Sequence, residues 1–157
     1  NRARLRLKKK KKRECVLGQA LPINLAVSLH QTNDIDRSNL MPINRKFNLT
    51  ELEKALEYYC NKTKNRITFE YTLIKNQNDG KKNIDELYNF AKHIKCHINL
   101  IPLNPIDEFD EKRPSKDEIN EFKNLLEKKG FNVTIRRELG RDISASCGQL
   151  RRKIEVK

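Results

Sequence analysis

The stretch RITFEYTLIKNQNDGKKNIDELYNFAKHIKCHINLIPL, residues 66–103, decides the fold. Residues 66–74 and 97–103, at its two ends, are short apolar-rich runs that are typical of buried strands. Between them, turn residues at 76–80 lead into a segment with the apolar spacing of a helix. The buried side of this helix is predicted to carry Ile84, Leu87, Tyr88, Ala91 and Ile94. A strand, a helix and a second strand in this order predict parallel strands joined by a right-handed crossover.

The same order of strand and helix occurs before this unit. Residues 23–29 form another short apolar run, and residues 48–60 have an amphipathic helical pattern. Thr50 and Glu53 have the spacing of a capping box at the start of that helix. Its apolar face is predicted to consist of Leu49, Leu52, Leu56 and Tyr59.

A further helix and strand are predicted after residue 103. Ser115 and Glu118 form a second capping box, and Gly130 suits the end of the helix. The apolar face between them consists of Ile119, Phe122, Leu125 and Leu126. Residues 132–138 have the composition of a last strand.

The whole pattern predicts an α/β fold with about four mainly parallel strands and flanking helices. Strand-first units of this length build open sheets and also (β/α) barrels, so the four strands are equally compatible with part of a barrel. In either architecture, ligands bind beyond the carboxyl ends of the strands.

Three of the predicted strands end in polar residues. The first ends at Ser28-Leu29-His30, the third at Asn104, and the last at Arg136 and Arg137. If the strands are parallel, these groups lie at one edge of the sheet. Each also has a structural explanation, because Ser28 and His30 can bond loop backbone, Asn104 precedes a proline, and the arginines can be solvated.

Length and composition favour one globular domain. The chain has 157 residues, of which 36% are hydrophobic. Its longest apolar run, residues 23–29, is far shorter than the roughly 20 residues of a membrane-spanning helix. The N-terminal segment has no apolar core of a secretory signal, so a cytoplasmic location is the default expectation.

The net charge of +13 is concentrated at the start of the chain. Residues 1–13 contain nine basic side chains and no acid, which leaves 25 basic against 21 acidic residues in the rest. Such a block is commonly disordered and can bind phosphate backbones. We favour a solvated tail, or sequence foreign to the fold.

The four cysteines, Cys15, Cys60, Cys96 and Cys147, are far apart, so neither a CxxC zinc pair nor a disulfide framework is indicated. His93, Cys96 and His97 lie close in sequence, but no fourth ligand is near and no metal site is expected. Cys147 differs in having arginines on both sides. Nearby cations lower the pKa of a thiol and favour reactive thiolate, although most solitary cysteines are inert.

Several stretches together resemble the C-terminal half of the RlmN/Cfr family of radical S-adenosylmethionine (SAM) RNA methyltransferases. The resemblance extends in order over about residues 21–152 and is carried by LAVSLH (25–30), LMPINR (40–45), ITFEY (67–71), NLIPLNP (99–105) and CGQL (147–150). The RlmN branch methylates C2 of an adenine in 23S rRNA and in some tRNAs, whereas the Cfr branch methylates C8 of the rRNA adenine. The residues at 69–71 and 103–105 are more similar to those of the C2 branch.

The resemblance implies a part of a radical SAM (β/α) barrel, with SAM and a 4Fe-4S cluster as cofactors. It places Ser28, Leu29, His30 and Asn104 at the SAM pocket, and makes Cys147 the cysteine that is methylated by one SAM. A second SAM is then cleaved by the cluster, and the radical formed activates the methyl group for addition to adenine. The implied partners are 23S rRNA, tRNA and an external electron donor. RNA contacts are expected from Arg136, Arg137, Arg141, Arg151 and Arg152.

The sequence departs from the family pattern in one respect that bears on activity. The family holds its cluster with a CxxxCxxC motif, and none occurs in these 157 residues. We therefore expect residues 1–20 to be a disordered or non-native basic segment, residues 21–152 the C-terminal half of the methyltransferase domain, and residues 153–157 a tail. The chain is expected to be a monomer, and to be inactive without the rest of the enzyme.

Two other hypotheses remain open from the sequence. The chain could be a non-catalytic RNA-binding module that uses its basic tail and C-terminal arginines. It could also be a fragment without function, with an exposed strand edge and a tendency to aggregate.

Overall fold

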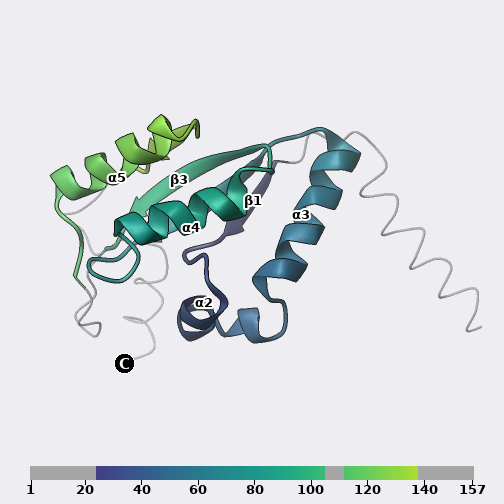
Figure 1. Ribbon diagram of the computed structural model, residues 1–157, viewed down its shortest axis with the longest axis horizontal. Coiled ribbons are helices and arrows are strands. Elements are labelled where there is room, and N and C mark those ends of the chain that lie inside the picture. Colours follow the sequence, from purple (N-terminus) through teal and green to yellow (C-terminus); the bar gives the residue numbers. More distant parts are fainter. Residues whose placement is uncertain (1–23, 105–111, 138–157) are drawn as a thin grey trace, which may run out of the picture.

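Four parallel strands form the centre of the molecule in the computed structural model, which describes residues 24–104 and 112–137. They are β1 (Leu25–Ser28), β2 (Ile67–Leu73), β3 (Cys96–Pro102) and β4 (Val133–Ile135). Their order in the sheet is β1-β2-β3-β4, the same as their order in the chain (Figure 1). The predicted α/β fold with four parallel strands is therefore confirmed.

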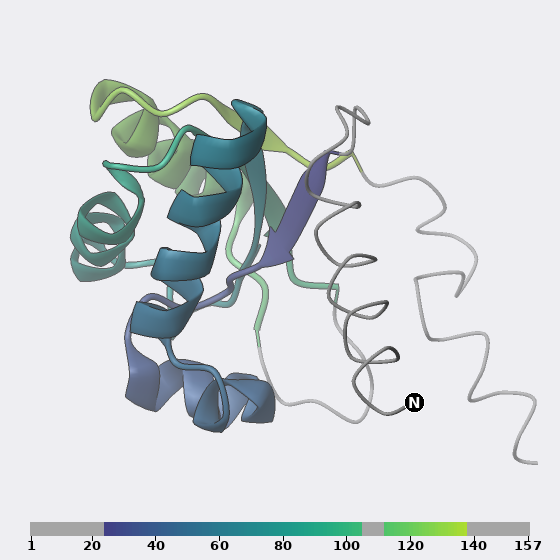
Figure 2. The same cartoon turned by 90° about the vertical axis from the view of Figure 1, so that its right-hand side faces the viewer.

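Three long helices connect the strands and lie on one side of the sheet. They are α3 (Leu49–Thr63), α4 (Lys81–Ala91) and α5 (Lys116–Lys128), and Figure 2 shows all three on the same side of β1. In a doubly wound fold the strand order reverses and helices cover both faces, whereas in a barrel each new strand is added at the same edge of the sheet. The observed strand order, and the position of the helices on one face, are therefore those of part of a (β/α) barrel.

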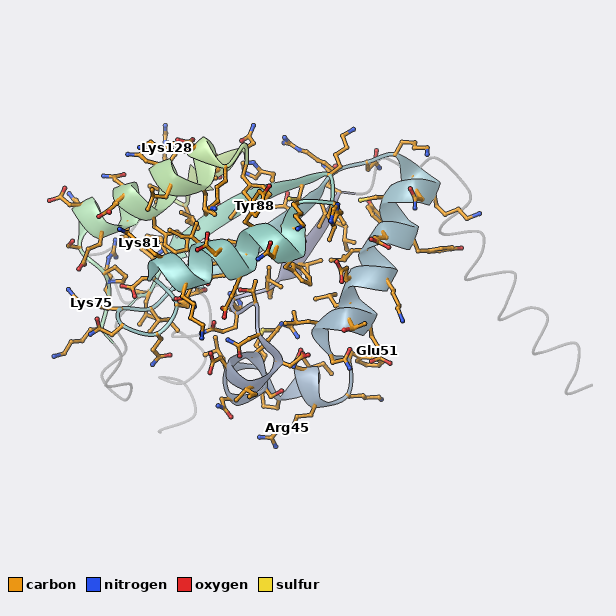
Figure 3. The ribbon with its side chains drawn as sticks, viewed as in Figure 1. Arg45, Glu51, Lys75, Lys81, Tyr88 and Lys128 are labelled. Atoms are coloured by element: carbon orange, nitrogen blue, oxygen red, sulfur yellow. The ribbon has the colours of Figure 1, made fainter. Side chains whose placement is uncertain are left out.

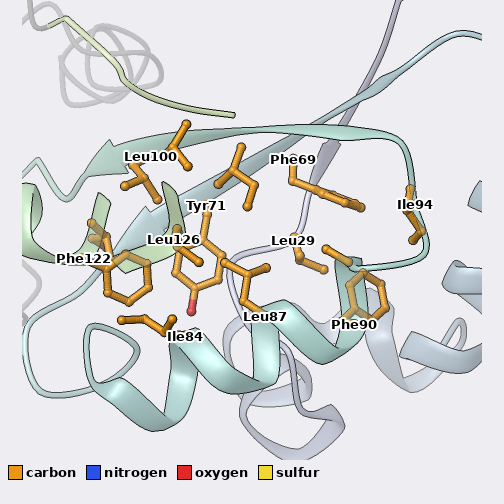
Figure 4. Close-up of a cluster of buried hydrophobic side chains, with 14 of the residues drawn as sticks. Leu29, Phe69, Tyr71, Ile84, Leu87, Phe90, Ile94, Leu100, Phe122 and Leu126 are labelled. Atoms are coloured by element: carbon orange, nitrogen blue, oxygen red, sulfur yellow. The ribbon is translucent and has the colours of Figure 1, made fainter. Parts of the chain in front are cut away.

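The hydrophobic core lies between the sheet and these helices. Along β2 the side chains of Ile67, Phe69, Tyr71 and Leu73 are fully buried, while the residues between them are half-buried on the opposite face. This alternation follows from the two-residue period of a strand. Figure 4 shows Phe69 and Tyr71 pointing toward the helices, where Tyr71 stacks on Phe122 with ring centroids 5.9 Å apart.

The ends of the helices confirm one predicted cap and correct another. Ser115 and Glu118 form a capping box at the start of α5, and Gly130, at φ +92°, follows its end. The predicted box of Thr50 and Glu53 is wrong, because the N-cap of α3 is Asn48, whose side chain accepts a hydrogen bond from the backbone N–H of Glu51. Asparagine caps helices as well as threonine does, so the helix begins two residues earlier than the Thr50 signal suggests.

The predicted inner face of α4 is mostly confirmed. Ile84, Leu87, Ala91 and Ile94 are buried. Tyr88 is only half-buried, and its ring lies at the margin of the core against Phe131 and below the ammonium group of Lys129.

A short helix and a 3-10 turn between β1 and α3 were not predicted. They are α2 (Asp34–Leu40) and η1 (Pro42–Arg45). Neither has an apolar face with helical spacing, and their contacts are largely polar. Among the residues placed by the structure, no helix has the length and apolar character needed to cross a membrane.

Candidate functional site at the carboxyl ends of the strands

Four polar side chains form a row across the sheet, one from each strand. Ser28 is paired in register with Glu70, Glu70 with Asn99, and Asn99 with Thr134. They lie on the face opposite the helices, because their neighbours along each strand are the ones that pack into the core. In a barrel this face is the inner one, and ligands bind at the carboxyl ends of the strands.

Hydrogen bonds connect most of this row. The side-chain amide of Asn99 donates to Glu70, with its nitrogen 3.2 Å from each carboxylate oxygen. The hydroxyl of Thr134 donates to Asn99 Oδ1 at 3.1 Å. His97 lies beside the row, with its ring nitrogens 2.9 Å from Thr134 Oγ1 and from Asn132 Oδ1. The carboxylate of Glu70 is thus held next to Ser28. This end of the row is the one near Ser28 and His30, which are expected to bind SAM.

His30 is held at the edge of the sheet by two neighbours. Its ring nitrogen Nδ1 accepts a hydrogen bond from the backbone N–H of Thr72 at 3.1 Å, and its carbonyl accepts one from Asn78 at 2.8 Å. Since a backbone N–H can only donate, Nδ1 carries no proton, and the neutral ring must carry its proton on Nε2. Its backbone is left-handed, with φ +57°, which is uncommon for a residue other than glycine.

Burial also keeps the His30 ring neutral. Its pKa is lowered from the ordinary value first by desolvation and then by the charge of Arg37, while Glu70 acts in the opposite direction. A neutral imidazole with Nε2–H is a hydrogen-bond donor. The site therefore offers a donor at His30 and acceptors at Glu70.

Leu29 anchors the residues on either side of it. Its side chain is fully buried in the core. Its backbone N–H donates to the carbonyl of Glu70 at 3.0 Å, and its carbonyl accepts from Arg37 Nε at 3.1 Å. Ser28, Leu29 and His30 are the three residues expected at the SAM pocket from this strand end. Since the Leu29 side chain is buried in the core, its expected contribution is to hold Ser28 and His30 in position.

Arg37, in the unpredicted helix α2, holds the end of β1 through hydrogen bonds to its backbone. It is buried, and its guanidinium donates to the carbonyls of Ser28 and Leu29 and to Asn44 Oδ1, the last at 2.6 Å. Asn44 in turn donates to Asp34 Oδ1 at 2.9 Å. Desolvation lowers the pKa of Arg37, and the charge of Asp34 opposes that shift. Sequence periodicity could not reveal this cluster, because its members are held by hydrogen bonds rather than by an apolar face.

Asn78 lies on the other side of the site and was also not predicted as a site residue. Its side chain is fully buried in the loop after β2. Oδ1 accepts from the backbone N–H of Ile74 at 2.7 Å, and Nδ2 donates to the carbonyls of His30 and Thr72. The turn sequence at 76–80 indicated a loop here, but not a side chain that joins two strand ends.

The remaining predicted site residues fall into two groups. Asn104 is exposed after β3, and Arg136 and Arg137 are exposed after β4, so the structure brings all three to the same edge of the sheet as Ser28 and His30. The others lie outside the described residues: Cys147, Arg141, Arg151 and Arg152.

The two cysteines in the described part of the chain are poor nucleophiles. Desolvation raises the pKa of the Cys60 thiol, and it raises that of Cys96 to about 11. A thiol with a raised pKa contains little thiolate at neutral pH. Both ring nitrogens of His97 are engaged, and within residues 24–104 and 112–137 no three metal-ligating side chains gather at one point.

We expect the stability of the chain to fall in mild acid because of His30. Since its folded-state pKa is depressed, the unfolded chain binds the proton more readily. The stability that depends on the neutral ring is fully present above the ordinary pKa of about 6.5 and is lost as the pH falls from that value through the lower pKa of the folded state.

Replacement of His30 by asparagine should reduce this pH dependence. The asparagine amide can accept from Thr72 N–H, and asparagine tolerates a positive φ. Urea unfolding over a pH series checks this, with replacement of the exposed His93 by asparagine as control. Equal slopes in the His30→Asn variant and in the unsubstituted chain would contradict the assignment.

No protein-family model matches the chain. A protein from Alkaliphilus oremlandii named "Probable dual-specificity RNA methyltransferase RlmN" is 51% identical over 133 residues, which cover 85% of this chain and 39% of that protein. The crystal structure of a radical SAM methyltransferase from Sphaerobacter thermophilus has a TM-score of 0.81 and 43% identity, over 87% of this chain and 40% of that one.

A third likeness concerns the fold alone. A domain of pyruvate-formate lyase-activating enzyme from Bacteroides vulgatus has a TM-score of 0.57 at 20% identity, over 72% of this chain and 66% of that one. Together the two structures agree with the partial (β/α) barrel inferred from strand order. The chain spans about two-fifths of the length of the curated relatives it matches. Over most of its length, this chain is therefore similar in sequence to proteins named RlmN and in fold to a radical SAM methyltransferase.

Proposed function

We propose that this chain provides one side of the SAM pocket and the methyl-carrying cysteine of an RNA methyltransferase that modifies C2 of adenine. The observation that carries the proposal is the row of polar groups that begins at Ser28 and Glu70 and lies beside His30, on the face of the sheet without helices. It is supported by the identity of about one residue in two to proteins named as RNA methyltransferases.

The residues present suit a bound SAM molecule. SAM carries hydroxyl and amino groups that donate hydrogen bonds, and ring nitrogens and a carboxylate that accept them. Glu70 offers acceptors, His30 Nε2–H offers a donor, and the Ser28 hydroxyl offers both. Asn104 is proposed as a further SAM contact from the end of β3. SAM, when bound, supplies an electrophilic methyl group.

Cys147 is proposed as the acceptor of that methyl group. Its thiolate sulfur forms the bond to the methyl carbon while S-adenosylhomocysteine leaves. Arginines on both sides of Cys147 in the sequence favour the thiolate form. No CxxxCxxC motif occurs in these 157 residues, and we propose that other parts of the enzyme hold the 4Fe-4S cluster.

A chimeric enzyme tests this function. The matched 133 residues of the Alkaliphilus relative are replaced by those of this chain. We expect the chimera to transfer labelled methyl from SAM to RNA and to yield 2-methyladenosine after nuclease digestion. The 157-residue chain alone should transfer none and should form no stable iron–sulfur absorbance after anaerobic reconstitution.

Two results would count against the proposal. A folded, cluster-loaded chimera that transfers no methyl group would contradict the proposed function. Formation of 8-methyladenosine would assign the chain to the C8 branch instead. A stable cluster in the isolated chain would show that it needs no other part of the enzyme to hold one.

A further inference from the structure

A basic pocket lies next to the strand edge, at the start of α5. It has a volume of about 350 Å³ and is lined by residues from the ends of β3 and β4, from the segment before α5 and from the first two turns of α5. Three of these residues are cationic: Arg113, Lys116 and Arg136. Three apolar residues, Pro102, Ile119 and Ile135, and the polar Asn120 also line it. We define this set of seven residues as the basic pocket.

The backbone that carries the cations is well anchored. The backbone N–H of Arg136 donates to the carbonyl of Leu100 at 2.8 Å and so continues the pairing of β3 and β4. Arg113 lies between Lys112, whose carbonyl accepts from Lys75 N–H at 2.8 Å, and the buried Pro114. Lys116 is the first residue of α5. The three cationic side chains therefore extend from an anchored backbone.

The positive charge of the pocket comes from its side chains. The start of α5 is already capped, because Ser115 Oγ accepts from Glu118 N–H and the Glu118 carboxylate accepts from Ser115 N–H. Glu118 is also paired with Lys75 at 3.1 Å, on the side of the cap. No carboxylate is among the residues that line the pocket. The charged residues that line the pocket are therefore all cations.

We propose that the basic pocket binds one nucleotide of the RNA substrate, with a backbone phosphate against the cations and the sugar or base over the apolar residues. Lysine and arginine bind phosphates, and such contacts fix the register of a nucleic acid without reading its sequence. A volume of about 350 Å³ is within the range of small-ligand sites. The inference rests on the proposed function. The pocket is at the same strand edge as the SAM site but lies between the sheet and α5, so it would hold a part of the RNA other than the reacting adenine.

RNA binding by the full chain tests the pocket. The probe is a short fluorescein-labelled RNA oligonucleotide, and fluorescence anisotropy is measured over a series of salt concentrations. The variant Arg113→Gln/Lys116→Gln/Arg136→Gln should raise Kd about tenfold or more at low salt. It should also reduce the slope of log K against log salt by about 2, since each phosphate contact to a single strand contributes about 0.7.

The control variant is Lys54→Gln/Lys81→Gln/Lys128→Gln, which removes the same net charge from exposed positions on the three helices. Figure 3 labels Lys81 on α4 and Lys128 on α5. This control is needed because residues 1–13 contribute nine basic side chains to any nonspecific binding. Exposed cations contribute little to stability, so the control variant should unfold like the unsubstituted chain, and urea unfolding of the pocket variant confirms that it is folded.

The proposal predicts a loss of affinity in the pocket variant and little change in the control. Equal losses in both, no loss in either, or no RNA binding at all would overturn it. So would binding of inorganic phosphate that RNA does not displace. The measurement uses neither SAM nor turnover, so a negative result here is separate from failure of methyl transfer in the chimera.

Discussion

Replacement of Asn78 by alanine should destabilise the chain by about 3 kcal/mol. The side chain is fully buried and joins three backbone groups, the N–H of Ile74 and the carbonyls of His30 and Thr72. Alanine would leave these groups without their partner in a place that water does not reach, and each unsatisfied buried group costs about 1–3 kcal/mol. The loss should therefore exceed that of an ordinary surface substitution several-fold.

Urea unfolding measures this effect, and Asn89→Ala provides the control. Asn89 is exposed on α4 and accepts only a long bond from Lys92, so its replacement should cost less than about 0.5 kcal/mol. Asn78→Asp separates the two halves of the side chain, because it keeps the acceptor for Ile74 and loses the donors to the carbonyls. If Asn78→Ala and Asn89→Ala unfold alike, Asn78 does not hold the strand ends together.

Replacement of Cys147 by alanine in the chimera should abolish RNA methylation, by more than about 10³-fold. An aromatic C–H carbon is too weak a nucleophile to take a methyl group from SAM by displacement. A sulfur atom must therefore accept the methyl group first. Without Cys147 no methyl group is positioned for transfer to adenine.

Cys60→Ala is the matched control for this prediction. The Cys60 thiol has a raised pKa because of desolvation, and it packs at the margin of the core near the end of α3. Its loss should leave methyl transfer nearly unchanged. Substantial methylation of RNA by the Cys147→Ala chimera would show that the sulfur is not the carrier.

The sheet could be predicted from the sequence because hydrophobic alternation and burial coincide in it. Ile67, Phe69 and Tyr71 are apolar in the sequence and buried in the structure. The strands begin within two residues of their predicted starts. By contrast, α2 escaped prediction because Arg37 and Asn44 are buried through hydrogen bonds, and a pattern of apolar spacing contains no such signal.

The candidate site could be predicted only in part for a similar reason. Parallel strands necessarily bring their carboxyl ends together, so Ser28, His30 and Asn104 were predictable from their positions at strand ends. The role of Glu70 depends on register, which pairs it with Ser28 on one side and Asn99 on the other. Register and the left-handed turn at His30 are set by tertiary contacts and could not be predicted from local sequence.

The most direct test of the central claim follows the methyl group itself. The chimera is incubated with SAM that carries a trideuterated methyl group, before and after RNA is added, and the peptide containing Cys147 is analysed by tandem mass spectrometry. We expect the labelled methyl group to appear first on the Cys147 sulfur. Label at C2 of adenine should follow once RNA is present. Labelled RNA from an enzyme whose Cys147 never carries the label would contradict it.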